Sequence, residues 1–180
     1  MKKCALVIGH KKSSPGAINS TSGVSEFVYN DSLSIDIENE VSSVSSGVQI
    51  QRIYRRTLKM LPNDINEYSP DFIISLHCNA FDGLVSGTEV LYYHRSSMAK
   101  NIAKILNKHL TEALGLKNRG LKPKNSENRG GYLLKYTIAP CIIAEPFFID
   151  NDEDFKIATE KRELLIKAYA NGIKAVANFI

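Results

Sequence analysis

The sequence predicts an α/β protein in which helices flank a central sheet. Two observations carry this prediction. Short apolar runs rich in β-branched and aromatic residues alternate along the chain with longer amphipathic segments, and turn-forming residues separate them. The resulting order is strand, helix, strand, helix, strand, strand, helix, strand, helix, which is typical of layered α/β folds. Because 180 residues suit one hydrophobic core, we expect residues 1–180 to form a single domain.

The first half of the chain places two histidines directly after predicted strands. The elements expected there are a strand at Cys4–Ile8, a loop at Lys11–Gly23, a helix at Val24–Val41, a turn at Ser42–Gly47, a strand at Val48–Ile53, a short helix at Asn63–Glu67 and a strand at Phe72–Leu76. His10 follows the first of these strands and His77 the last. Glu26 falls in the first turn of the first helix, which Ser22 or Ser25 can cap, and a carboxylate there also complements the helix dipole.

The second half places a glutamate at the end of another buried strand. The expected elements are a strand at Gly87–Tyr93, a helix at Ser97–Leu114, an exposed polar loop at Asn118–Gly131, a helical turn at Tyr132–Leu134, a strand at Ile142–Ala144 and a helix at Thr159–Phe179. Glu145 emerges at a strand end, where Pro146 blocks continuation. Open α/β sheets bind ligands at the carboxyl ends of their strands, so residues in such positions are site candidates.

Composition argues against several classes of protein. The formal net charge is +4, but no block of Lys or Arg exceeds two residues and Trp is absent, so a nucleic-acid partner is not supported. Cys4, Cys78 and Cys141 lie in or beside apolar runs without a CxxC pair, which indicates buried reduced thiols. The apolar run near the N-terminus is too short for a signal peptide or a membrane span. We therefore expect synthesis in the cytoplasm and no membrane insertion.

Four side chains in these positions suit a hydrolytic metal centre. Two imidazoles and one carboxylate are a sufficient ligand set for a catalytic zinc ion, with the fourth position left for water. A further carboxylate outside the ligand set can then act as a general base in amide hydrolysis. The available residues are His10, Glu26, His77 and Glu145. Their spacings are long and irregular, so the pattern alone is weak evidence for a site.

The chain resembles a known family over nearly its whole length. The resemblance rests on Leu6–His10, Pro15–Ala17, Gly23–Glu26, Ile65–Asn66, Asp71–Ala80, Gly87–Val90, Asn118–Leu121, Ala139–Glu145 and Phe148–Asn151. In this order the segments are similar to those of the zinc-dependent N-acetylmuramoyl-L-alanine amidases of type 3, which occur as bacterial cell-wall hydrolases and phage endolysins.

This resemblance implies His10, Glu26 and His77 as Zn²⁺ ligands and Glu145 as the catalytic base. It also implies a twisted mixed sheet with helices on both faces, in three layers. The expected substrate is peptidoglycan, cut between N-acetylmuramic acid and L-alanine, with lysis of the cell wall after the membrane is breached.

Substrate contacts are harder to predict from the sequence. Asn79, just after His77, and Arg129, in the glycine-rich loop, are candidates for holding substrate. The three arginines Arg52, Arg55 and Arg56 fit a solvated face, with contact to an anionic substrate as the alternative.

Other functions remain open at this level. One is a zinc peptidase or carboxypeptidase that acts on peptidoglycan peptides with the same four groups. Another is a wall-binding module without turnover. A phosphate-binding α/β protein using the Gly9–Gly16 loop is disfavoured, because that loop has neither a GxGxxG nor a Walker pattern. Oligomeric state is not indicated.

Overall fold

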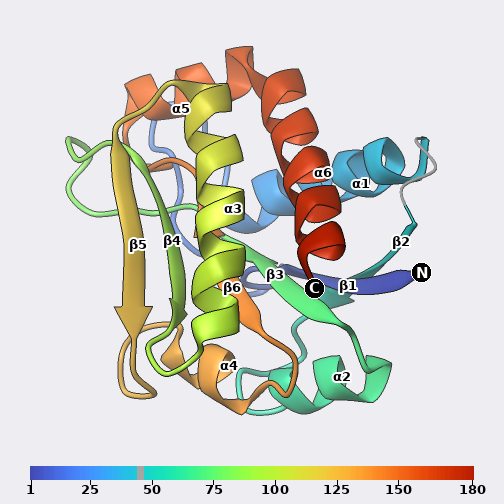
Figure 1. The fold of residues 1–180 in the computed structure, drawn as a ribbon. Helices are drawn as coiled ribbons and strands as arrows, with labels where there is room; N and C mark the ends of the chain where they lie inside the picture. Colours follow the sequence, from blue (N-terminus) through green and yellow to red (C-terminus); the bar gives the residue numbers. More distant parts are fainter. Residues whose placement is uncertain (44–46) are drawn as a thin grey trace.

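Six strands form one mixed sheet in the computed structural model, which describes residues 1–43 and 47–180 (Figure 1). The strands are β1 (Lys2–Ile8), β2 (Val48–Tyr54), β3 (Phe72–Leu76), β4 (Thr88–Tyr93), β5 (Asn118–Lys124) and β6 (Cys141–Glu145). The helices are α1 (Glu26–Ser43), α2 (Leu61–Tyr68), α3 (Ser97–Leu114), α4 (Gly131–Tyr136), α5 (Asp152–Glu160) and α6 (Arg162–Phe179). The strand order is β2-β1-β3-β6-β4-β5.

Four adjacent strands of this sheet run parallel. They are β2, β1, β3 and β6, while β4 pairs with β6 in the antiparallel sense and β5 runs parallel to β4. Every residue of β3 is buried. Parallel strands covered on both faces favour such continuous apolar sequences, which explains why the central strands are recognisable without an alternating pattern.

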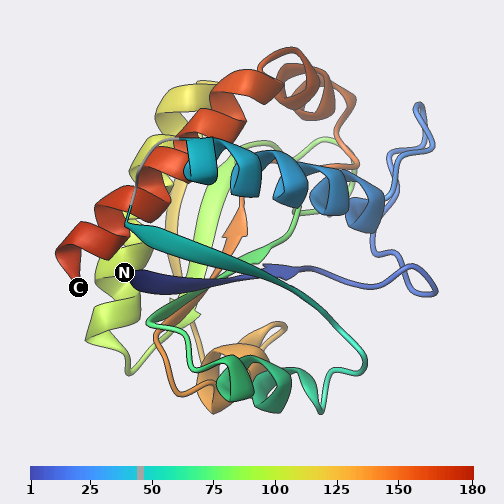
Figure 2. The same ribbon diagram turned by 90° about the vertical axis from the view of Figure 1, so that its right-hand side faces the viewer.

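Helices cover both faces of the sheet (Figure 2). Successive side chains of a strand point to opposite faces. Leu6 and Ile74 accordingly pack with residues of α1, α3 and α6, whereas Val7 and Ile73 pack with residues of α2 and α4. The predicted three-layer α/β architecture is confirmed.

The register of the parallel strands brings their carboxyl ends to one edge. Ile8 pairs with Leu76, and Leu76 pairs with Ala144. The residues that follow continue this alignment, because Gly9 N donates to Leu76 O at 2.9 Å and His77 N donates to Ala144 O at 3.0 Å. Side chains just beyond these strands therefore gather at the same rim of the sheet.

Two predicted elements differ from the structure. The segment Asn118–Gly131 is not a loop throughout, because Asn118–Lys124 forms the edge strand β5. Gly120 and Pro123 obscure this strand in the sequence, and an edge position tolerates both residues. The final helix begins earlier than Thr159 and is divided at Lys161 into α5 and α6.

The remaining local predictions agree with the structure where it describes them. Ser25 caps α1, since its Oγ accepts from Val28 N at 3.3 Å. The short helix near Asn63–Glu67 is α2, with Pro62 in its first turn. The turn expected at Ser42–Gly47 begins later than predicted, because Ser42 and Ser43 still belong to α1, and residues 44–46 lie outside the described residues. Within the described ranges, no helix has both the length and the apolar character that a membrane span requires.

Candidate metal centre and adjoining cavity

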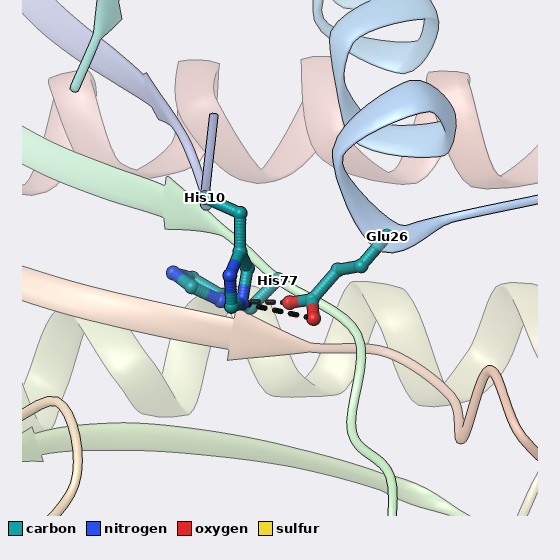
Figure 3. Close-up of side chains that lie close together, drawn as sticks. All are labelled: His10, Glu26 and His77. Carbon is teal, nitrogen blue, oxygen red and sulfur yellow. Dashed lines mark hydrogen bonds and ion pairs between the residues drawn. The ribbon is translucent and has the colours of Figure 1, made fainter. Parts of the chain in front are cut away.

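Three side chains from distant parts of the chain converge at this rim of the sheet (Figure 3). His10 follows β1, His77 follows β3, and Glu26 is the first residue of α1. The carboxylate of Glu26 lies between the two rings: its Oε1 is 2.8 Å from His77 Nδ1 and its Oε2 is 3.0 Å from His10 Nε2. One potential ligand atom from each residue lies within 4.8 Å of the others.

Glu26 is completely buried, and its carboxylate is held from several sides. Cys78 N donates to Oε1 at 3.0 Å and Ala17 N donates to Oε2 at 3.4 Å. Burial alone would raise the pKa of Glu26, but the interactions with His10 and His77 outweigh it and hold the pKa well below its ordinary value. The site therefore keeps an ionised carboxylate between two imidazoles.

The backbone around the cluster is shaped to let these groups approach. His10 has a φ of 65°, a conformation that few residues other than glycine adopt. A Cβ on Gly9 would lie 2.8 Å from His77 Nδ1, and one on Gly16 would lie 2.6 Å from Glu26 Oε2. Both glycines are therefore required by the close packing of the cluster rather than by loop flexibility alone.

The three residues fit a divalent metal ion. Imidazole nitrogens and a carboxylate oxygen are ligands that zinc prefers. His10 Nε2 is buried and, although it lies close to Glu26, makes no hydrogen bond of acceptable geometry among the described residues. A buried polar atom without a partner is costly, and a shared cation would satisfy it. The three residues that the family resemblance implies as ligands thus lie close together in space.

Glu145 stands at the end of β6, beside the cluster and opposite a second glutamate. Its partner across the antiparallel pair is Glu89 on β4, whose Oε2 accepts from Arg119 Nε at 2.7 Å. Burial, with the negative charges of Glu89 and Glu26, raises the pKa of Glu145 to about 8, while Arg129 and Lys124 act in the opposite direction. Glu145 is therefore poised to exchange a proton near neutral pH.

A cavity of about 680 Å³ adjoins these groups on the face of the sheet that carries α2 and α4. His10, His77 and Glu145 line it, as do the two predicted substrate contacts Asn79 and Arg129. The cavity thus brings all the predicted site residues except the buried Glu26 to one surface. Its volume is in the range typical of small-molecule sites.

Sequence reasoning did not single out several residues of this cavity. Glu89, Lys59 and Lys124 line it, and they come from β4, the β2–α2 connection and the end of β5. Glu89 belongs to the segment Gly87–Val90 that contributes to the family resemblance, so a signal for it was present. Lys124 could not be placed at the cavity from the sequence, because its segment was expected to be a loop rather than a strand of the sheet.

The raised pKa of Glu145 predicts how the stability of the metal-free protein depends on pH. Between about pH 4.5, the ordinary value, and about pH 8, the folded state retains a proton that the unfolded state has lost. Stability contributed by this group is therefore present below pH 4.5 and declines as the pH rises to 8. We expect Glu145→Gln to remove this decline, which makes the variant more stable than the parent at pH 8 by about 2 kcal/mol after allowance for solvent screening.

Urea denaturation of metal-free parent and variant at pH 5 and pH 8 measures this difference. The free energies of unfolding of the two proteins should diverge as the pH rises. If the difference between them stays constant over this range, Glu145 ionises normally in the fold.

An α/β sheet with a His/Glu/His cluster and an adjoining protonatable carboxylate has the features of a metal-dependent hydrolase. Comparison with known proteins defines the class further. A family model described as N-acetylmuramoyl-L-alanine amidase (Amidase_3) matches residues 4–175. The chain therefore belongs to this amidase family, whose members are typically metal-dependent.

Individual relatives agree with this assignment. An uncharacterized cell wall amidase of Bacillus anthracis is 32% identical over 94 residues, which are 48% of this chain and 17% of that protein. The match thus spans less than a fifth of the length of that relative. The N-acetylmuramoyl-L-alanine amidase of Clostridium difficile 630 has the same fold, with a TM-score of 0.85 and 20% identity over 98% of this chain and 97% of that chain. The catalytic domain of an endolysin targeting Clostridia difficile is 27% identical, with a TM-score of 0.82 over 96% of this chain and 97% of that one.

Proposed function

We propose that residues 1–180 form a single catalytic domain that hydrolyses the amide bond between N-acetylmuramic acid and L-alanine of peptidoglycan in a zinc-dependent reaction. The family supplies the reaction, and one observation connects it to this chain. His10, Glu26 and His77 converge within 4.8 Å at the rim of a cavity that Glu145 also lines. The bound substrate would therefore meet both the metal ligands and the proposed base.

The roles of the residues follow from their chemistry. His10, Glu26 and His77 would hold the zinc ion, with one imidazole nitrogen from each histidine and the carboxylate of Glu26 as ligands. Zinc in this position would supply Lewis acidity to polarise the scissile carbonyl and to activate water near neutral pH.

Glu145 would carry the proton that hydrolysis moves. As the water oxygen bonds to the lactyl carbonyl carbon, Glu145 accepts a proton from that water. As the carbon–nitrogen bond breaks, it returns the proton to the departing nitrogen of L-alanine. The products are a lactyl carboxylate and a free amino terminus. A pKa raised toward neutral pH suits a group that must both accept and donate.

Asn79 and Arg129 would position the substrate. Asn79 is held beside His77 by the backbone, because its N donates to Phe147 O and its O accepts from Ile149 N, each at 2.9 Å. Arg129 precedes α4 and lines the same cavity. These placements support contact between both side chains and a bound substrate.

The similarity to the catalytic domain of an endolysin supports a lysin-type role. In this proposal the chain is a phage or prophage enzyme that reaches the cell wall once the membrane is breached. Its partner is the peptidoglycan itself.

Metal analysis combined with product analysis tests the proposed function. We expect the purified protein to contain about one zinc ion per chain and to release new N-terminal L-alanine from purified cell walls. Chelation should abolish this release, and added Zn²⁺ should restore it. A carboxypeptidase would instead release a carboxyl-terminal residue and expose no new amino terminus. A wall-binding module would sediment with the walls and release nothing. Either of these outcomes would reject the proposal.

A further inference from the structure

The cavity beside the candidate metal centre carries an excess of positive charge. The cationic residues that line it are Arg55, Lys59, Lys124 and Arg129. Only two carboxylates, Glu89 and Glu145, line it among the described residues, and Glu89 is already paired with Arg119. In the part of the chain that the structure describes, none of the four cations forms an ion pair with a carboxylate. Their charge is therefore available to a ligand.

Arg55 differs from the arginines next to it in sequence. Arg52 donates from Nε to Glu38 at 2.7 Å, and Arg56 pairs with Asp64, so the charges of both arginines are already neutralised by carboxylates of the protein. Arg55 instead follows the carboxyl end of β2 and faces the cavity, where burial lowers its pKa and the charge of Glu26 acts against that change. Of the three arginines noted in the sequence, this one is placed to meet an anionic substrate.

Arg129 is carried by a loop with a defined backbone. Asn125 N donates to Asn128 Oδ1 at 3.0 Å, and Asn128 N donates to Asn125 Oδ1 at 3.1 Å. Gly130 has a φ of 79°, and a Cβ on Gly131 would lie 1.8 Å from Asn125 O. This close turn fixes the direction in which the chain enters α4. Arg129 is therefore presented to the cavity from a preorganised segment, which limits the entropy lost when it binds a ligand.

The uncleaved substrate restricts what these cations can bind. In the intact bond the lactyl carboxyl group is part of the amide, so the muramoyl side offers no carboxylate. The carboxylates belong to the stem peptide, and the one closest to the scissile amide is the α-carboxylate of the second residue, a γ-linked glutamate. This group occurs either as a free carboxylate or as a primary amide. A guanidinium group forms paired, charge-assisted hydrogen bonds with the carboxylate but not with the amide.

We propose that Arg55 and Arg129 make this chain selective for stem peptides whose second residue carries a free carboxylate. The inference rests on the proposed amidase function and adds a specificity to it. The remaining cavity cations, Lys59 and Lys124, add to the positive potential that draws the acidic peptide in.

Two soluble muramoyl peptides that differ only at this group test the proposal. We expect the parent to show a kcat/KM at least about tenfold higher for the carboxylate form than for the amide form, a ratio that corresponds to about 1.4 kcal/mol. Most of the difference should appear in KM, and the ratio should fall as salt is added. In the Arg55→Gln/Arg129→Gln variant the ratio should approach one. The control is Arg95→Gln, which removes an exposed arginine outside the cavity and should keep the parental ratio.

The outcomes separate this inference from the function on which it depends. Equal cleavage of both peptides by the parent would overturn the selectivity while leaving the amidase function in place. A parental ratio that persists in the double variant would also overturn it, because other residues would then carry the selectivity. Cleavage of neither peptide by the zinc-loaded parent would reject the amidase function together with this inference.

Discussion

Replacement of Glu145 by glutamine is expected to reduce the release of N-terminal L-alanine by about 10²–10⁴-fold, the range that general acid–base catalysis supplies. Glutamine has nearly the same shape but cannot accept the proton of the attacking water. Because Glu145 is not among the three clustered ligands, the variant should retain its zinc ion. The measurement is the rate of amino-terminus release from cell walls, together with the zinc content of the same preparation.

A matched variant separates the effect of this carboxylate from a general change in charge. Glu127→Gln removes an exposed carboxylate from the neighbouring loop, outside the cavity lining. It should keep both activity and metal. If Glu145→Gln retains more than about a tenth of the parental rate, the loss is smaller than the roughly 100-fold that is the least general-base catalysis supplies. In that case another group moves the proton.

The positions of the site residues could be predicted because they follow from the ends of buried strands. The apolar runs before His10, His77 and Glu145 identify three strands, and parallel strands necessarily share the edge at which their carboxyl ends lie. The adjacency of these strands was not predictable from periodicity, since strand order depends on long-range packing. Glu26 belongs to a helix, so the strand ends did not indicate it as a site residue. Its role as a metal ligand was implied by the family resemblance.

Other features depend on contacts that a single sequence does not show. The edge strand Asn118–Lys124 has neither a continuous apolar run nor a clear alternation, because much of it is only partly buried. The pairing of Glu89 with Glu145 follows from the antiparallel register of β4 and β6, which the order of elements leaves undefined. The difference between Arg55 and its neighbours is similarly invisible in the sequence, where all three suit a solvated face.

Replacement of Glu26 by glutamine is expected to have the largest effect on the metal. The carboxylate is the only anionic member of the cluster, and it bridges the two histidines at 2.8 and 3.0 Å. A neutral amide is a much weaker ligand for zinc than a carboxylate. Loss of a group that merely orients a ligand costs about 10–100-fold in metal affinity, so loss of a ligand should exceed about 100-fold. Activity at equal total zinc should fall to background.

Competition with a zinc-binding dye measures this loss of affinity, and circular dichroism shows whether the variant remains folded. The comparison with Glu145→Gln is informative because both variants convert one glutamate of the same rim into its amide. Glu145→Gln should lose turnover and keep zinc, whereas Glu26→Gln should lose both. If Glu26→Gln binds zinc as tightly as the parent, Glu26 is not a ligand, and its place between the two histidines would serve only to fix their orientation. The opposite result, with zinc lost from a folded protein, would assign the two glutamates to different parts of one reaction.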